Sequence, residues 1–248
     1  MRLGRNRRGI LALVACLGCA SAPQFSNMDA DQLLQYALDR LDAHKWDDAS
    51  RALDQFIFQY PTHERYQEAR YRVGEAHFGK GEYLIAAAEF ARLADDFPAG
   101  EWAQKARFDV CDSYYRLSPN PQLDQEYTVS AFDQCRLVLA YYPDGEYADT
   151  VRTMLTELQN KLATKELEAA LHYFKRGAYD SAIIYFEKVL SGYPSSPAAP
   201  RALFGLYRSY TERGWEEEAT QARERLLRDF PESVEAKNLG SGAAVAPS

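Results

Sequence analysis

The amino-acid sequence predicts an all-α fold, a right-handed superhelical solenoid of about five helical hairpins. An aromatic residue followed by proline occurs five times, at residues 60–61, 97–98, 142–143, 193–194 and 230–231. An alanine lies twelve residues before each of these prolines, and the residues seven and eight positions after that alanine are apolar, which keeps them on one helix face. No long stretch alternates apolar and polar residues, so we expect essentially no β-sheet.

The first residues have the features of a secretory signal. Residues 1–8 hold four arginines and no acidic residue, and residues 9–15 form an apolar run that is too short to cross a membrane. The segment Leu13-Val14-Ala15-Cys16 resembles the bacterial lipobox. We therefore expect residues 1–15 to be a lipoprotein signal peptide and Cys16 to carry the lipid. Cys19 is the alternative lipidation site, and an ordinary signal peptide cut elsewhere is a further alternative.

Two segments without a periodic apolar pattern flank the repeats. Residues 20–28 are mostly small and polar and contain a proline, which predicts that residues 16–28 form a flexible tether. Residues 238–248 have no apolar helix face, which predicts a disordered tail. The repeats are therefore expected within residues 29–237.

A second amphipathic stretch precedes each of the five alanine-to-proline segments. Short polar or glycine-containing turns join the two predicted helices. Small residues recur where the paired helices should approach, at Ala37, Gly74, Cys111, Ala170 and Gly205. The predicted repeats cover about residues 30–62, 65–99, 102–144, 147–195 and 198–232. This helix–turn–helix–proline unit resembles the tetratricopeptide repeat.

The intervals between the five prolines are 37, 45, 51 and 37 residues, which exceed the 34 residues of a minimal repeat. The extra length in repeat three is assigned to a loop at residues 118–127 between its two helices. The extra length in repeat four is assigned to its first helix. If that helix is continuous over residues 146–176, it spans about 46 Å at 1.5 Å per residue.

The first helices of stacked repeats are expected to form a concave wall, which suits an extended peptide. Aromatic and basic residues on these helices are the candidates for a substrate-peptide groove: Tyr36, Arg40, Arg70, Tyr71, His77, Phe108 and Tyr115. The competing interpretation is that most of these side chains pack one repeat against another.

Several other functions are disfavoured by the composition. A formal net charge of −7 argues against a nucleic-acid binder. Residues 74–80 approach a phosphate-binding loop, but the Ser or Thr that binds magnesium is missing and no strand precedes them. The four histidines show no metal-ligand spacing, and no motif for a catalytic nucleophile occurs. We expect no enzyme activity, no metal and no cofactor.

Cys111 and Cys135 should both face the seam between the two helices of repeat three. A disulfide between them is one arrangement, since the periplasm is oxidising. Two buried free thiols that act as small apolar residues are the alternative.

Five repeats behind a lipobox resemble the BamD family, lipoproteins of the machinery that assembles β-barrel proteins in bacterial outer membranes. The most specific part of the resemblance is repeat three, with Asp112-Ser113-Tyr114-Tyr115 and the later segment Leu123-Asp124-Gln125-Glu126-Tyr127-Thr128. The chain departs from the family in its Ala/Gly/Ser tail, which offers no obvious additional docking helix.

The resemblance implies a non-enzymatic lipoprotein that is lipid-anchored in the outer membrane and faces the periplasm. It implies that N-terminal repeats bind unfolded outer-membrane proteins and that C-terminal repeats bind a BamA-like barrel assembly protein, alongside other assembly lipoproteins. The C-terminal candidates for partner binding are Arg201, Tyr207 and Arg208. The alternative is a tetratricopeptide lipoprotein adaptor of another envelope complex, for cell-wall synthesis or exopolysaccharide export.

Overall fold

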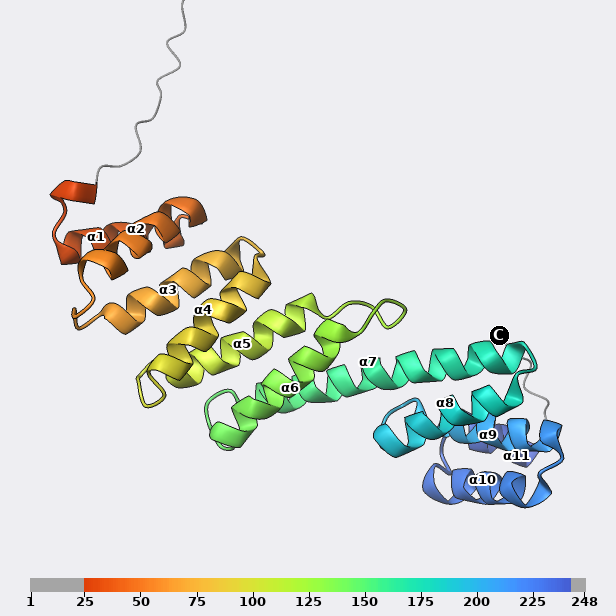
Figure 1. Ribbon diagram of the computed structural model, residues 1–248. Helices are drawn as coiled ribbons and strands as arrows, with labels where there is room; N and C mark the ends of the chain where they lie inside the picture. Colours follow the sequence, from red (N-terminus) through yellow and green to blue (C-terminus); the bar gives the residue numbers. More distant parts are fainter. Residues whose placement is uncertain (1–24, 242–248) are drawn as a thin grey trace, which may run out of the picture.

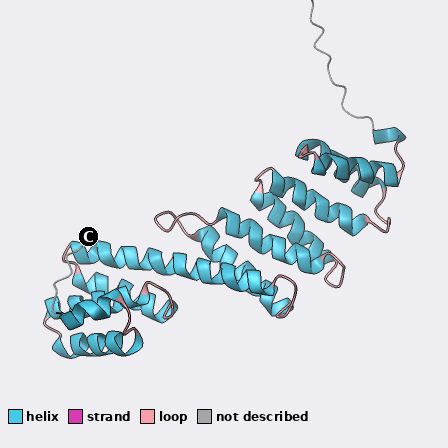
Figure 2. Cartoon of the chain, turned by 180° about the vertical axis from the view of Figure 1, so that it is seen from behind, coloured by secondary structure: helices cyan, strands magenta, loops and turns pink. Residues whose placement is uncertain are grey.

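The computed structural model describes residues 25–241, and this part of the chain consists of helices and short connections with no strand (Figures 1 and 2). The elements in chain order are η1 (Phe25–Asn27), α1 (Ala30–Asp42), α2 (Trp46–Gln59), α3 (Tyr66–Gly79), α4 (Tyr83–Asp96), α5 (Ala103–Leu117), α6 (Glu126–Tyr141), α7 (Ala148–Lys175), α8 (Tyr179–Gly192), α9 (Ala199–Arg213), α10 (Glu216–Asp229) and α11 (Val234–Ser241).

The ten helices from α1 to α10 form five successive hairpins, and each hairpin lies within one of the predicted repeats. Successive helices pack against one another along the chain, which gives the elongated stack seen in Figure 1. The predicted all-α repeat fold is confirmed. The long first helix of repeat four is also continuous, because α7 has 28 residues and therefore spans about 42 Å.

The aromatic residue of each aromatic–proline pair ends the second helix of its repeat. Its backbone N–H donates to the carbonyl four residues earlier, as from Tyr60 to Phe56 at 2.8 Å and from Tyr193 to Val189 at 2.8 Å. The next residue is proline, which has no N–H and cannot continue the helix. The repeated dipeptide is thus the stop signal of the hairpin.

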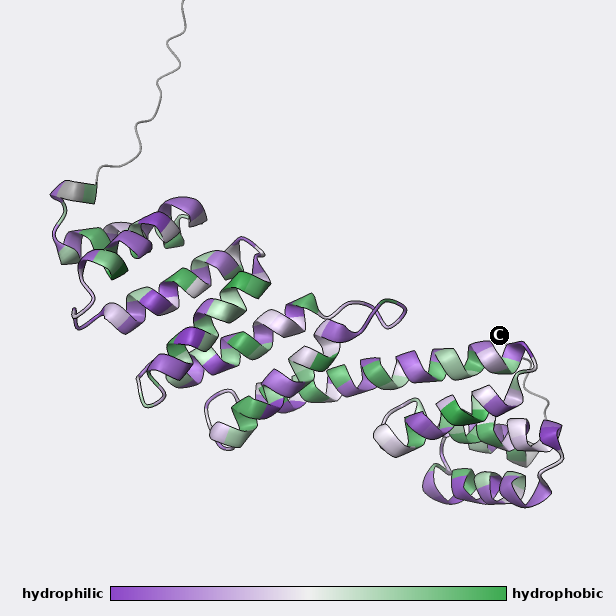
Figure 3. Cartoon of the chain, viewed as in Figure 1, coloured by the Kyte–Doolittle hydropathy of each residue, from purple (hydrophilic) through white to green (hydrophobic). Residues whose placement is uncertain are grey.

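Small residues set the spacing of the paired helices. A Cβ atom placed on Gly74 would lie 2.4 Å from the ring of Phe90, and one on Gly205 would lie 2.2 Å from the ring of Phe186. The five repeated alanines are buried as well: Ala49, Ala86, Ala131, Ala182 and Ala219. Figure 3 shows hydrophobic and hydrophilic residues interspersed along each helix.

Repeat three carries a disulfide between Cys111 on α5 and Cys135 on α6, with a Cα–Cα distance of 4.7 Å. Both residues are fully buried beside Val151, Met154 and Leu158 of α7. Of the two arrangements considered from the sequence, the structure contains the bonded pair.

The predicted boundaries differ from the structure at both ends. Phe25 packs edge-to-face on Tyr36 at 5.8 Å, and the Tyr60 hydroxyl donates to the Met28 carbonyl at 3.3 Å, so residues 25–28 belong to the fold and not to a tether. Residues 238–241 are helical in α11, where Ala236 and Leu239 pack against the C-terminal core. This helix was missed because eight residues are too few to show a periodic pattern beside a Gly/Ser-rich segment.

Residues 1–24 and 242–248 lie outside the described part of the chain. They include the predicted signal peptide, both candidate lipidation cysteines and the rest of the predicted tail.

The seam between paired helices predicts the effect of one substitution. Ala182 is fully buried on α8, so Ala182→Arg would force a long charged side chain into packed space. Overpacking together with a buried charge should lower the free energy of unfolding by roughly 3 kcal/mol or more. Thermal melting followed by circular dichroism measures this loss.

Ile184→Arg is the matched control, because Ile184 lies on the same helix and is 56% exposed. It adds the same charge without entering the seam and should leave the melting curve close to that of the wild type. Equal melting curves for Ala182→Arg and the wild type would contradict the close packing of the paired helices at Ala182.

Candidate functional site

A groove with a volume of about 690 Å³ opens between the first helices of repeats one, two and three. It is lined by Gln35, Leu38, Leu41, Asp42, His44, Trp46, Tyr71, Arg72, Glu75, Phe78, Gly79, Phe90, Lys105, Asp109 and Asp112. Helices α1, α3 and α5 supply most of these residues, as expected for the concave wall of a repeat stack.

The helical repeat explains why these side chains share one surface. Arg72 and Glu75 are separated by one turn on α3, and Lys105, Asp109 and Asp112 are spaced by four and three residues on α5. Residues at these spacings lie on the same helix face. The remaining faces of α3 and α5 pack against neighbouring helices, so the polar stripe is left to line the groove.

Tyr71 forms the floor of the groove and is only 1% exposed. Its ring lies 5.3 Å from that of Phe90 and is stacked on that of Trp102 at 4.7 Å. Its hydroxyl donates to the Asp109 carboxylate, and the Lys105 ammonium contacts both this hydroxyl and, at 3.3 Å, the same carboxylate. Tyr71 therefore links α3 to α5 through packing and hydrogen bonds together.

Burial governs the ionisation of this cluster. It raises the pKa of Asp109, against the opposing influence of the Tyr71 hydrogen bond and the Lys105 charge. Burial and the charge of Asp109 also raise the pKa of Tyr71 well above its ordinary value. The phenol consequently stays protonated and remains a hydrogen-bond donor at physiological pH.

Arg72 adds a cation to the wall of the groove. Its guanidinium lies 5.4 Å from the Trp102 ring centroid and pairs with Glu75 at 2.6 Å and Glu68 at 3.6 Å. Its buried Nε atom has no hydrogen-bond partner. The wall therefore combines aromatic faces with a guanidinium that retains an unused donor.

The groove lining carries charges of both signs. Two cations, Arg72 and Lys105, lie among four carboxylates, and no serine, threonine or cysteine lines the groove. Across the described residues, no group of three or more His, Cys, Asp or Glu side chains could hold a metal ion.

Three of the predicted groove residues lie on other faces of the N-terminal helices. Tyr36 holds the guanidinium of Arg40 over its ring at 4.6 Å and packs against η1. Arg70 turns toward Asp96, at 3.6 Å, and Tyr66. None of the three lines the groove described above.

Three further predicted residues join neighbouring segments. His77 Nδ1 lies 2.7 Å from a Glu82 carboxylate oxygen across the turn between α3 and α4. Phe108 stacks on Tyr147 at 4.3 Å, and the Tyr115 hydroxyl donates to Glu157 of α7. Of the seven predicted residues, only Tyr71 lines this groove. Arg40 packs on Tyr36 of its own helix, and the other five contact a neighbouring segment of the stack.

The groove residues that sequence analysis missed are mainly Trp46, Arg72, Glu75, Lys105 and Asp109. The available signal was the three- and four-residue spacing of polar side chains next to Tyr71. The prediction selected residues by helix and residue type, without assigning them to a helix face.

The C-terminal candidates have different surroundings. Arg201 is exposed near the start of α9, whereas Arg208 lies with its guanidinium 4.8 Å from the Phe174 ring of α7. Tyr207 lines a separate groove of about 600 Å³ together with residues of α9, α10 and α11, among them Thr211, Ala219 and Leu239.

None of the described helices has the length and hydropathy needed to cross a membrane. The family model of the outer membrane lipoprotein YfiO matches residues 26–226. The chain belongs to this family.

Curated relatives of this YfiO-family chain carry the name outer membrane protein assembly factor BamD. The relative from Caulobacter vibrioides is 28% identical over 222 residues, which cover 89% of this chain and 73% of the relative. The relative from Rickettsia prowazekii is 25% identical over 236 residues, 94% of each chain. The relative from Xylella fastidiosa is 27% identical over 188 residues, 76% of this chain and 55% of the relative. The predicted resemblance to the BamD family is confirmed.

Among solved structures, the YfiO-family chain is similar to the tetratricopeptide domain of P58(IPK), with 19% identity and a TM-score of 0.45 over 84% of this chain and 53% of that one. It is also similar to the TPR2AB domain of yeast Sti1, with 14% identity and a TM-score of 0.47 over 84% and 80% of the two chains.

The raised pKa of Asp109 predicts a pH dependence of stability. A carboxyl group with a raised pKa in the fold binds its proton more tightly when folded, so its stabilising contribution is lost as pH rises through the folded pKa. Asp109→Asn cannot ionise and keeps an acceptor for Tyr71. Its melting temperature relative to the wild type should therefore be higher at about pH 7 than at about pH 4. If the difference in melting temperature between Asp109→Asn and the wild type is independent of pH, or is reversed, then ionised Asp109 does not destabilise the fold.

Proposed function

We propose that this protein is a non-enzymatic lipoprotein component of the machinery that assembles β-barrel proteins in the bacterial outer membrane. In this proposal its N-terminal repeats bind unfolded barrel substrates, and its C-terminal repeats carry a BamA-like barrel assembly protein. The groove across repeats one to three, in a chain of the YfiO family, is the observation that supports the proposal best.

The groove chemistry fits an extended barrel segment. Transmembrane β-strands alternate apolar and polar side chains, so an unfolded strand presents both kinds in a regular order. The groove offers aromatic surface at Trp46 and Phe78 beside the charged side chains of Arg72 and Lys105. A few aromatic and arginine contacts of this kind commonly dominate the affinity for a peptide.

The proposed location follows from the sequence at the N-terminus. Lipid attached to Cys16, or to Cys19, would anchor the chain in the outer membrane with the repeats facing the periplasm. Several acyl chains are needed for durable anchoring. Removal of residues 1–15 would leave a formal net charge of −11, so electrostatic attraction to anionic lipid would not contribute.

For the C-terminal repeats, we propose that the partner contacts the exposed end of α9 around Arg201 and the groove that Tyr207 lines. The groove is bordered by α11, so this helix belongs to the proposed surface. Other assembly lipoproteins are proposed as further members of the complex.

The peptide groove can be tested with Arg72→Gln. The amide keeps a planar group beside Trp102 but removes the charge, so the affinity for an aromatic-ended C-terminal peptide of a barrel protein should fall about tenfold, or ~1.4 kcal/mol. Fluorescence anisotropy measures the peptide affinity, and pull-down of the BamA-like partner should be unchanged.

Two control variants accompany this measurement. Arg92→Gln removes a charge on α4, where Arg92 is 59% exposed at its side chain, and should leave both interactions intact. Arg201→Glu should weaken binding of the BamA-like partner and leave the peptide affinity unchanged. Full peptide affinity in Arg72→Gln would exclude this groove as the substrate site.

The alternative, an adaptor of another envelope complex, predicts different partners. Affinity purification from the native membrane should recover barrel assembly proteins with the wild-type chain, because scaffolds co-purify with the components they hold. Recovery of enzymes for cell-wall or exopolysaccharide synthesis instead of barrel assembly proteins would support the alternative.

A further inference from the structure

Helix α7 is shared by two halves of the molecule. Its first half packs against α5 and α6, and its second half packs against α8 and α9 (Figure 1). We call α1–α6 the N-terminal lobe and α8–α11 the C-terminal lobe. On α7, Leu158 is the last residue buried in the core of the N-terminal lobe, and Ala163 is the first buried in the core of the C-terminal lobe. The helix therefore passes between two cores within about one turn.

No residue of the turn of α7 between the two cores is fully buried. Residues 159–162 are all partly or fully exposed. A bend at this turn would therefore disrupt few buried apolar contacts. The 14 residues from 162 to 175 extend about 21 Å beyond this turn, so a bend of about 20° would move their far end by about 7 Å.

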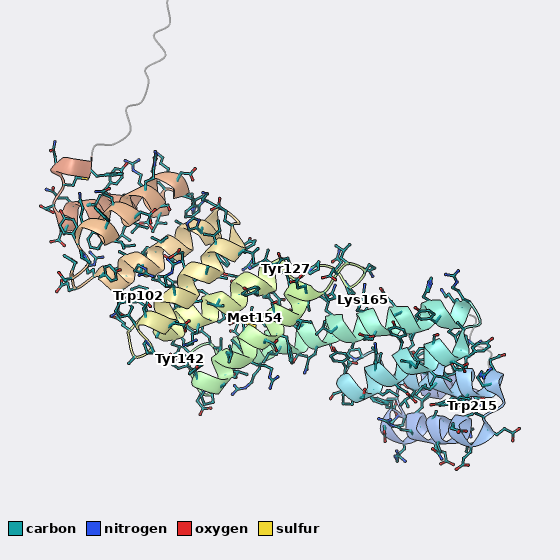
Figure 4. The ribbon with its side chains drawn as sticks, viewed as in Figure 1. Trp102, Tyr127, Tyr142, Met154, Lys165 and Trp215 are labelled. Carbon is teal, nitrogen blue, oxygen red and sulfur yellow. A yellow bond between two sulfur atoms is a disulfide. The ribbon has the colours of Figure 1, made fainter. Side chains whose placement is uncertain are left out.

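The loop of repeat three meets α7 at this turn. The Lys161 ammonium donates to the Ser118 hydroxyl at 2.7 Å and to the Ser118 carbonyl at 3.1 Å. One turn later, Lys165 donates to the carbonyls of Gln122 and Leu123, each at 3.1 Å. Figure 4 shows Lys165 on α7 near this loop.

The two lysines act from one face of α7, because they are four residues apart. Glu168, three residues further on, accepts a hydrogen bond from the Gln122 side chain at 2.7 Å. Burial lowers the pKa of Lys161. Its ammonium is thus partly desolvated, and the Ser118 acceptors replace water around it.

The loop is held in shape by its own hydrogen bonds. The hydroxyl of Thr128, which is 0% exposed, donates to Gln125 at 2.7 Å and lies 2.7 Å from the Ser118 hydroxyl oxygen. The Gln125 amide donates to the carbonyls of Asn120 at 2.9 Å and Leu123 at 3.0 Å. The carbonyls that the lysines bind are therefore fixed relative to α5 and α6.

We infer that residues 118–125 form a brace that, through Lys161 and Lys165, fixes the direction in which α7 leaves the N-terminal lobe. The brace sets the separation between the groove on α1, α3 and α5 and the surface of α9–α11. Lys161 and Lys165 are positioning residues, since they contact neither groove. The geometric part stands on the contacts alone, whereas its consequence for barrel assembly rests on the proposed function.

The test removes the lysine charges and keeps the side-chain length, in the double variant Lys161→Met with Lys165→Met. Spin labels on unnatural residues at positions 92 and 220 of the full chain, exposed sites on α4 and α10, report the distance between the lobes by double electron–electron resonance. The distance distribution should broaden about twofold, because the unbraced turn is free to bend.

Two matched variants separate the brace from a general loss of charge or stability. Lys188→Met with Lys237→Met removes two lysines outside the brace and should keep the wild-type distribution. Lys161→Arg with Lys165→Arg restores cationic donors and should narrow the distribution again. The brace would be overturned if Lys161→Met with Lys165→Met kept the wild-type distance distribution. It would also be overturned if the distribution of Lys161→Arg with Lys165→Arg were as broad as that of the methionine variant.

The functional consequence is measured in the same variants. With the brace removed, peptide affinity and partner affinity should each stay within about twofold of the wild type, because the two sites lie outside the brace. Reconstituted barrel assembly in liposomes should fall at least about fivefold, since the sites lose their fixed separation. Unchanged assembly despite a broadened distribution would overturn this consequence. Absence of peptide binding in the wild type would refute the proposed function and leave the geometric result intact.

Discussion

The close approach of paired helices at small residues is the constraint on which the structure depends. In repeat two, the ring of Phe90 occupies the space that a Cβ atom on Gly74 would need. In repeat three, the corresponding positions are Cys111 on the first helix and Cys135 four residues after the repeated alanine, and there a covalent bond replaces ring-on-glycine packing. Both contacts bring two helix axes close together. The disulfide therefore stands in the repeat whose two helices are separated by the longest loop, where local chain connectivity restrains them least.

The same constraint produces the groove. When the second helices fill the seams, the first helices α1, α3 and α5 lie side by side, and their remaining polar faces turn to a common side. Tyr71 shows how packing and groove lining are combined, because its ring packs between Phe90 and Trp102 while its hydroxyl donates to Asp109 on the next repeat. A side chain that forms the floor of the groove is thus also a contact between repeats. Changes in the angle between repeats two and three must alter the shape of the groove.

The fold was predictable from sequence because its determinants are local. The alanine and the apolar pair lie on one helix, the aromatic–proline stop follows directly at its end, and this pattern recurs five times. The face that each side chain occupies was less predictable, since it depends on how neighbouring repeats pack. Arg70 and Tyr71 are adjacent in sequence, yet Arg70 turns to Asp96 and Tyr71 lines the groove. Elements η1 and α11 were missed for a related reason. Each is short, and short helices depend on tertiary contacts such as those of Phe25 with Tyr36 and of Leu239 with the C-terminal core.

The long helix α7 determines how the two halves of the stack are placed relative to each other. In a regular solenoid each repeat contacts only its neighbours, so the relative position of distant repeats depends on every interface between them. Here the relation between the two halves passes through one helix that is buried in one core up to Leu158 and in the next from Ala163. A helix of this kind sets a defined separation only if the turn between the two cores is prevented from bending. The loop of repeat three, which lengthens the chain beyond a minimal repeat, supplies hydrogen bonds at that turn through Lys161 and Lys165. The two departures from the regular repeat, the inserted loop and the long helix, therefore form a single structural unit.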